Sequence, residues 1–376
     1  MKLSIAQLNA LIASYVSQSK ISVDSFEVTR DNTVGLLDKI GKIVTLDTSY
    51  IDKLTMFEGE FLSYGKTVEE YQEDLKLPEA FSASGDGALS PHDGTYRPVF
   101  YSYTLGRKVI PMTIRNNDIE RAVHFVEQFI SIIQMKSKRL YDSVAMWRYG
   151  VKREMLAKLI GYCQTHASSS SYAGETFANN KDYAVGALVR SASTGTIAYG
   201  IVVKAITSGD YSNWAGAVAG GSVIVYDLIK EIAVPSDTSS SEAFIEQVKK
   251  DVEVASDLSE GHSLNGNTLG ATDGLALIVK QGVMPVVEVE AIAGAFHEQK
   301  LALPAEVIVV KDFGSDASGA FAILMDKRGA RLHNTYRAVR EQQNGSGDFL
   351  NVFYHTEDTA FISRNTFVRV YKPVSE

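Results

Sequence analysis

The chain has 376 residues, of which 45% are hydrophobic and 22% are charged, a balance that supports one or two buried cores and excludes global disorder. The formal net charge of −8 argues against tight, sequence-independent binding of nucleic acid by the whole chain, because such binding needs clustered cations. Cys163 is the one cysteine, which excludes an internal disulfide. Its neighbours Leu159 and Ile160 predict a buried thiol, and folding in a reducing cytoplasm fits this composition.

The first 25 residues are predicted to form a short amphipathic helix, followed by extended chain to about Thr48. The apolar residues near one stripe of this helix are Leu3, Leu8, Leu11, Ile12 and Tyr15. Polar residues such as Ser4 interrupt the apolar positions, and the sequence has no run of about 18 or more apolar residues. We therefore expect an N-terminal arm, without a signal peptide or a membrane span.

Two strand-like arms lie between Met56 and Ile114, separated by a loose polar stretch. In the second arm one set of residues alternates with another, which is the period-two pattern of a strand. The first set is Val99, Tyr101, Tyr103 and Leu105, and the second is Phe100, Ser102 and Thr104. Neither arm looks built for the interior of a compact domain. A long hairpin with charges and aromatic rings on both faces needs partners elsewhere, so we predict that it reaches toward neighbouring copies.

The strongest periodic signal follows this hairpin, as apolar residues in steps of three and four. They are Ile119, Val123, Val126, Ile130, Ile133, Leu140, Val144, Trp147, Val151 and Met155. A continuous helix here would be about 60 Å long, and a break near His124 or at Gly150 is the alternative. The cations along it are Lys136, Lys138, Arg139, Arg148, Lys152 and Arg153. They predict a solvated face, or else contacts with the acidic hairpin of another copy.

The rest of the chain predicts an α+β fold. A Gly- and Ala-rich stretch at about 186–234 indicates an insertion with its own small sheet. Serine N-caps at 239–241 begin a helix through Leu258. The expected later strands are Ala276–Val279, Glu306–Val310, Ala320–Met325, Phe349–His355 and Phe367–Lys372, with a helix at Glu288–Phe296 and turns at Asp326–Gly329 and Asn344–Gly347.

No motif points to catalysis, a metal or a cofactor. His297 begins a segment resembling a zinc-protease helix, but the second histidine is missing. Ser90, His92 and Asp93 are too close in sequence to point at one another in series, as a nucleophilic triad requires. The histidines are scattered, so we expect no enzyme activity and no cofactor.

Taken in order, several segments resemble the major capsid proteins of tailed bacteriophages, specifically the small short-tailed phages of the phi-twenty-nine type. The segments are D-K-I-G-K-I-V at Asp38–Val44, G-K-T-V-E-E-Y-Q-E-D-L at Gly65–Leu75, V-I-V-V-K-D-F at Val307–Phe313, A-I-L-M-D-K at Ala322–Lys327 and F-L-N-V-F-Y-H at Phe349–His355. Each is weak alone, but together their order and spacing are specific. They span about half of the chain.

The resemblance implies the capsid fold known from the Hong Kong 97 phage. Its parts map here as an N-terminal arm at 1–52, an extended hairpin loop at 53–114, a peripheral domain at 115–264, an axial domain at 265–340, and returning peripheral strands at 341–376. The peripheral domain would contain a spine helix at 117–164 and the insertion at about 186–234, which is longer than we expect for this type.

A shell protein must join identical chains through many modest contacts, so we predict that the hairpin, the N-terminal arm and the spine helix supply them. Val99, Tyr101, Tyr103 and Leu105 would lie on or near the sheet that overlaps a neighbour. Rim ion pairs would come from Lys66, Glu69, Glu70, Arg97 and Arg107.

The implied function is self-assembly, through hexamers and pentamers, into a head shell that encloses double-stranded DNA without gripping it. The implied partners are a separate scaffolding protein and a portal protein, with no membrane. Assembly would occur in the host cytoplasm and the product would be the virion. The alternatives are the shell of a cellular nanocompartment that encloses an enzyme cargo and, in another class, a tail or adhesion protein.

Overall fold

The computed structural model describes residues 50–70, 99–100, 102–115, 126–167, 174–192, 197–268, 270, 274–284, 287, 305–317 and 319–374. The predicted helices at 1–25 and 288–296 lie outside these residues. The chain divides into two units, which are described separately: one comprises Met1–Asp52, Arg107–Arg148 and Tyr336–Glu357, and the other Lys53–Gly106, Tyr149–Thr335 and Asp358–Glu376.

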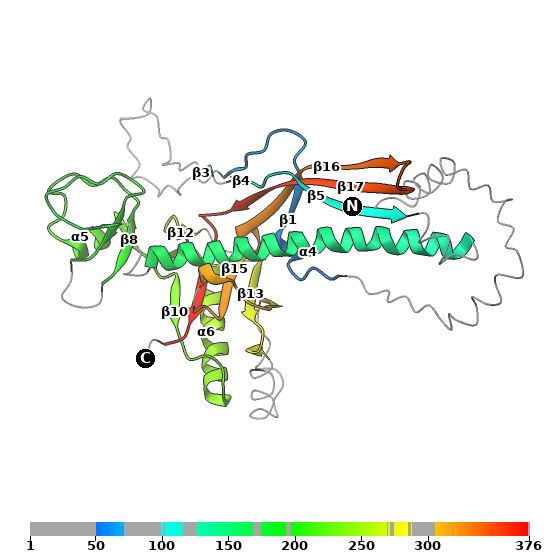
Figure 1. Ribbon diagram of the computed structural model, residues 1–376. Coiled ribbons are helices and arrows are strands. Elements are labelled where there is room, and N and C mark those ends of the chain that lie inside the picture. The colour runs from blue at the N-terminus through cyan, green and yellow to red at the C-terminus, as the bar shows by residue number, and fades with distance from the viewer. Residues whose placement is uncertain are drawn as a thin grey trace, which may run out of the picture. The chain divides into compact units, whose positions relative to one another are not determined.

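The long helix α4 (Val126–Ala167) confirms the predicted long helix, while residues 117–125 of the predicted range lie outside the described residues (Figure 1). It continues through Gly150 without a break, while His124 lies outside the described residues. The strands β16 (Ala330–Asn344) and β17 (Phe349–Ile362) are, like α4, shared between the two units. The structure extends β17 beyond the predicted His355. The long strand β16 was not predicted at all.

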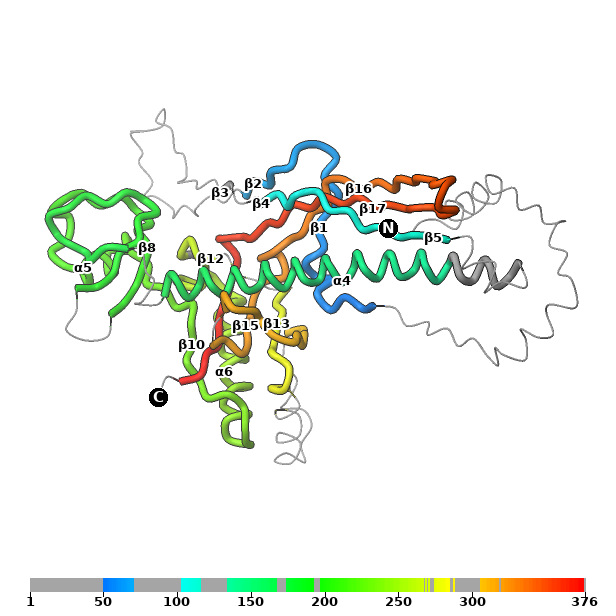
Figure 2. The backbone as a smooth tube through the Cα atoms, viewed as in Figure 1, coloured from blue at the N-terminus to red at the C-terminus, as the bar shows by residue number. Residues whose placement is uncertain are grey.

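In the first unit, β17 lies between β16 and the antiparallel strand β5 (Lys108–Arg115), as Figure 2 shows. Ile114 of β5 is opposite Leu350 of β17, and both side chains are buried. Helix α4 contacts this face at Tyr141, whose ring meets that of Tyr354 edge-on at 6.3 Å. Burial, with Tyr354 adding to it, raises the pKa of Tyr141 to about 12.

The second unit is built on a five-stranded sheet in the order β10-β18-β15-β13-β14. The bounds are β10 (Ile229–Glu231), β13 (Leu275–Lys280), β14 (Glu306–Val310), β15 (Ala322–Asp326) and β18 (Val368–Lys372). Parallel pairing joins β13 to β14 and β10 to β18, and antiparallel pairing joins the others. The predicted strands in this region are confirmed. In this sheet, β10 and β18 of the predicted peripheral domain pair with each other, and β18 also pairs with β15 of the predicted axial domain. The boundaries between these domains stay a prediction.

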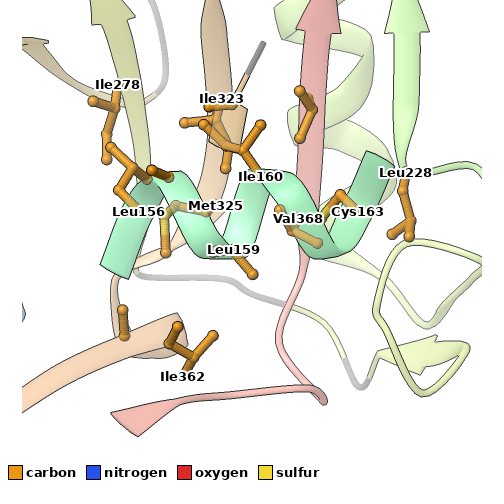
Figure 3. Packing of buried hydrophobic residues seen from close by; sticks show 14 of the residues in the cluster. Leu156, Leu159, Ile160, Cys163, Leu228, Ile278, Ile323, Met325, Ile362 and Val368 are labelled. Atoms are coloured by element: carbon orange, nitrogen blue, oxygen red, sulfur yellow. The ribbon is translucent and has the colours of Figure 1, made fainter. Parts of the chain in front are cut away.

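Alternate residues of this sheet face two different cores, which explains its nearly continuous apolar strands. One face packs against the C-terminal half of α4, where Leu156, Ile160 and Cys163 meet Ile278, Ile323 and Val368 (Figure 3). The buried Cys163 confirms the sequence prediction, and burial raises the pKa of its thiol. The opposite face carries Leu277, Leu324 and Tyr371, which pack against Phe244 and Val248 of α6 (Thr238–Ser256).

The start of α6 differs from the prediction of a serine N-cap. Asp237 is the N-cap, and its carboxylate accepts a hydrogen bond of 2.8 Å from the Ser240 amide. The Ser240 hydroxyl accepts a bond from the Asp237 amide, which completes a capping box. The aspartate takes the position because its charge also interacts favourably with the positive N-terminal end of the helix.

The Gly- and Ala-rich stretch forms the predicted small sheet, in the order β6-β7-β8-β9, of which β6 lies before residue 186. Its elements are β6 (Glu175–Thr176), β7 (Leu188–Arg190), β8 (Tyr199–Val202), α5 (Trp214–Ala219) and β9 (Val223–Val225). Ile201 and Ile224 face the main core, whereas Val202 and Val223 face a separate small core beneath α5. Gly200 is required here, because a Cβ atom on it would lie 2.4 Å from the carbonyl oxygen of Ile224.

A buried polar cluster ties α6 to the sheet. Arg369 of β18, with its side chain only 5% exposed, pairs with Asp227 at 2.5 Å and with Asp251 of α6 at 3.4 Å. Asp251 also accepts hydrogen bonds from the Tyr371 hydroxyl at 2.7 Å and from Gln247 at 2.9 Å. The buried charges of Arg369 and Asp251 are tolerated because they are paired and hydrogen-bonded, whereas the Asp227 side chain is 55% exposed.

Asp227 makes the stability of the fold dependent on pH. Burial acts to raise its pKa, but hydrogen bonds from His262 and Arg369 outweigh burial and hold the pKa well below its ordinary value. Such a group stabilises the fold at pH above its unfolded pKa of about 3.9, and the contribution is lost as pH falls through the folded pKa. The stability advantage of the wild type over Asp227→Asn should therefore shrink as the pH is lowered below about 4. Urea unfolding at several pH values measures this, and a difference independent of pH would contradict it.

Candidate intersubunit contact site

The base of the first hairpin arm is part of the chain's own core. Leu54 and Phe57 are fully buried, and β1 (Glu58–Phe61) pairs in parallel with β16, with Glu58 opposite Leu332. The guanidinium of Arg331 also donates a hydrogen bond of 2.6 Å to the carbonyl oxygen of Met56. The prediction that neither arm is built for the interior of a domain is therefore wrong for this base.

Lys152 of α4 holds the same base through an ion pair. Its side chain is 0% exposed, and its Nζ lies 2.6 Å from Oε1 of Glu58, whose side chain is 41% exposed. Arg153 pairs with Asp312 at 3.5 Å. The prediction of a solvated cationic face is therefore wrong for Lys152, which is a buried charge with a partner in its own chain.

The second arm joins the same sheet through β4 (Ser102–Thr104), which pairs antiparallel with β17, so that Tyr103 is opposite Ala360. The Tyr103 side chain is 65% exposed, and the ammonium of Lys158 lies 5.5 Å from its ring centroid. Leu105 instead packs against the main core, and its amide donates to the carbonyl oxygen of Asp358 at 2.8 Å. Leu105 is thus directed into its own chain.

The two arms meet where β2 (Glu69–Glu70) pairs antiparallel with β3 (Val99–Phe100), with Glu70 opposite Val99. This pairing confirms the predicted hairpin. Residues 71–98, which contain Arg97, lie outside the described residues, as does Tyr101.

Glu70 fixes the hairpin to the loop that follows β17. Its carboxylate accepts hydrogen bonds from the Ser363 hydroxyl at 2.5 Å and from the Arg364 amide at 3.2 Å. Nearby, the carbonyl oxygen of Lys66 accepts a bond of 3.1 Å from the Thr359 hydroxyl. The side chains of Lys66 and Glu69 are exposed. Glu70 is therefore engaged within its own chain, whereas Lys66 and Glu69 present charge to solvent.

Arg107 is the first residue of the second arm that belongs to the first unit. Its Nε lies 3.5 Å from Oε2 of Glu357, and its guanidinium carbon lies 4.0 Å from the ring centroid of Tyr336. The Arg107 side chain is still 52% exposed. Stacking on an aromatic ring and pairing with a carboxylate are both typical of arginine, and here they orient the side chain before any other chain approaches.

The family comparison decides the identity of the chain. The model of the family described as Phi29-like phage major capsid protein matches residues 6–370. The chain belongs to this family. The resemblance found from the sequence is thereby confirmed, and the protein is a structural component of a phage capsid shell, located in the virion. No curated protein matches it.

Solved capsid structures share the fold of this capsid protein. The capsid structure of Staphylococcus phage Andhra has a TM-score of 0.61 at 11% identity, and the match covers 89% of this chain and 88% of that chain. The capsid structure of the cyanophage P-SCSP1u has a TM-score of 0.51 at 9% identity and covers 89% and 92%. At identities this low, structural similarity establishes the fold alone. It confirms the predicted α+β phage capsid fold.

The described part of the capsid protein shows no group of histidine, cysteine and carboxylate residues suited to hold a metal ion. None of its described helices is both long and apolar enough to span a membrane. The segments around His92 and His297 lie outside the described residues.

Sequence reasoning missed the two anchors of the hairpin, Lys152 and the loop at Ser363 and Arg364. Ser363 lies 293 positions from Glu70, and no local pattern connects them. The burial of Lys152 had one signal in the sequence, which is its place beside the apolar positions of the helix: it comes one residue after Val151 and three before Met155.

Proposed function

We propose that the hairpin of this capsid protein carries the principal contacts between copies, and that these contacts join hexameric and pentameric capsomers into a closed shell around double-stranded DNA. The supporting observation is the contrast along the hairpin: its base is fixed in its own sheet, while Tyr103, Lys66 and Glu69 are exposed. A rigid base lets a neighbour bind the exposed part without first ordering it, which lowers the entropic cost of association.

The predicted contact residues take different roles in this proposal. Tyr101 and Tyr103 supply apolar contact, while Lys66, Glu69 and Arg97 form rim ion pairs. Such pairs are each worth about 0 to 1 kcal/mol, so they set register more than total stability. Glu70 and Arg107 act mainly by holding the hairpin base, because both already have partners within the chain.

The remaining proposals concern partners and domains. A separate scaffolding protein and a portal protein would assist assembly in the host cytoplasm, and the shell would act without enzymatic activity. The net charge of −8 suits a wall that encloses DNA without gripping it. We assign the hairpin to the extended loop, α4 to the spine helix, and the sheet around β13 and β15 to the axial domain.

The register of β2 and β3 allows a sharp test. Because Glu70 is opposite Val99, residues 71–98 can be replaced by the dipeptide Asn-Gly, which favours a two-residue hairpin turn. This variant should keep the fold, measured by circular dichroism and Trp fluorescence, and should fail to form closed shells in electron micrographs. A Gly/Ser segment of the original length is the matched control: we expect it to fail as well, because it restores the length but lacks Arg97 and the other side chains of residues 71–98. Closed shells formed by the Asn-Gly variant would overturn the proposal.

A further inference from the structure

The β5–β17 pair of the first unit has a second face, on which four apolar side chains lie among the polar side chains of Thr113, Arg115, Asn351 and His355. Side chains on a strand alternate between faces, so the residues next to the buried Ile114, Leu350 and Val352 point the other way. This outer apolar strip consists of Val109, Pro111, Phe349 and Phe353. The register places Phe353 opposite Pro111, and His355 opposite Val109.

The outer apolar strip is open to solvent in the structure. Val109 is 46% exposed, Pro111 is exposed, and Phe349 and Phe353 are only partly buried. Thr113 and Asn351 lie on the same face, and the hydrogen bond of 2.8 Å between their side chains is exposed. Apolar side chains grouped in this way on a sheet face are typical of a surface that another segment covers.

The start of the described chain indicates which segment this is. Residues 1–49 precede Tyr50, whose amide donates a hydrogen bond of 3.1 Å to Asp142 of α4 in the same unit. The N-terminal segment is therefore tethered to the unit that carries the strip. A tether gives the segment a high effective concentration at this face, far above that of a second copy in dilute solution.

The sequence of the segment matches the strip in pattern and length. Its predicted helix places Leu8, Leu11, Ile12 and Tyr15 on one stripe, and residues 3–15 would extend about 20 Å at 1.5 Å per residue. The strip extends from Val109 to Phe349, which is opposite Arg115, so it also spans about 20 Å of β5 at 3.3 Å per residue. From Met1 to Ser19 the side chains include one charge, on Lys2, so packing on an apolar face buries little charge.

We propose that the N-terminal helix at residues 3–15 packs its apolar stripe against the outer apolar strip of its own chain. This contact goes beyond the proposed role of the hairpin and does not depend on it. It covers apolar surface that would otherwise promote irregular association of newly made subunits. It also gives the N-terminal arm a defined position before shells form.

Cysteine crosslinking tests the proposal in the full-length protein. Leu8→Cys is combined with Val109→Cys, and a short bismaleimide is added; Cys163 is buried and stays in place. We expect a fast crosslink within one chain, seen as a monomer on a denaturing gel and as a linked peptide by mass spectrometry. Ala13→Cys with Val109→Cys is the matched control, because position 13 lies on the opposite side of the helix, and it should react several-fold more slowly.

Mixing isotopically light and heavy chains before the reaction identifies the occupant. Linked peptides of one isotope only support the proposal, whereas peptides of mixed isotope show a second copy on the strip and overturn it. Equal rates for Leu8→Cys and Ala13→Cys, or the absence of a crosslink, overturn it too. If Val109→Cys does not fold, Thr113→Cys on the same face replaces it. As a second readout, deletion of residues 2–16 should speed alkylation of that strand cysteine several-fold, and an unchanged rate contradicts the contact.

Discussion

Replacing Glu58 with alanine is expected to destabilise the chain by about 3 kcal/mol, because it leaves the fully buried ammonium of Lys152 without this carboxylate. The loss is large against the 5–15 kcal/mol that is typical of the total stability of a domain. It should appear as a lower urea midpoint of the unassembled full-length chain, followed by Trp fluorescence. The same change removes the ion pair that fixes β1 to α4, so we also expect faster proteolysis near Met56.

The matched control is Lys152→Met, which removes the buried charge itself and keeps an unbranched side chain of similar length. It should cost less than Glu58→Ala, because no buried ammonium then remains to lose the Glu58 carboxylate. The double variant that combines Lys152→Met with Glu58→Gln removes both charges of the pair. It should be no less stable than Glu58→Ala alone. A Glu58→Ala variant as stable as the wild type would show that water reaches Lys152, and it would contradict the assignment.

The long helix and the sheet of the second unit were predictable because their signals are local. The steps of three and four between Leu140, Val144 and Trp147 indicate a helix wherever the rest of the chain lies. Strands such as β13 and β15 are short apolar runs bounded by turn residues, and burial on both faces makes them continuous.

The strand β16 escaped prediction because its partners are distant and its pattern changes along its length. Its first half alternates buried and half-buried residues, while its second half, from Arg337 onward, is mostly exposed and rich in charge and amide groups. Its pairing with β1 joins Glu58 to Leu332, a contact that no sequence window contains. Pairing at such separation is decided by tertiary context, which overrides strand propensity.

In the contact site, too, features set by local sequence were predictable and features set by distant parts of the chain were not. The exposure of Tyr103 agrees with the alternation of the second arm, which is a local property. The side chain of Leu105 points into its own chain, which the alternation does not predict. The reason is that β4 ends at Thr104, and the alternation ends with it. The anchoring of Glu70 on Ser363 and the burial of Lys152 depend on distant parts of the chain. Charged side chains are mostly exposed in proteins, so sequence alone favours the wrong assignment for both.

Replacing Asp251 with alanine is expected to cost at least about 3 kcal/mol, because the buried Tyr371 and Arg369 and the half-buried Gln247 lose their shared acceptor. The Tyr371 hydroxyl donates to this carboxylate at 2.7 Å, Gln247 donates at 2.9 Å, and Arg369 lies 3.4 Å away. Burial raises the pKa of Tyr371 well above its ordinary value and Asp251 raises it further, so the phenol stays protonated and donates.

Two milder variants separate the parts of this Asp251 effect. Tyr371→Phe removes one donor and leaves the other two groups paired with Asp251, so it should cost only about 1 kcal/mol. Asp251→Asn keeps the volume and one acceptor oxygen but loses the charge that faces Arg369, so its cost should fall between those of Tyr371→Phe and Asp251→Ala. Urea unfolding of the full-length chain gives the three values. If Asp251→Ala were no worse than Tyr371→Phe, the link from α6 to β18 would depend on packing by Phe244 and Val248 rather than on the buried charges.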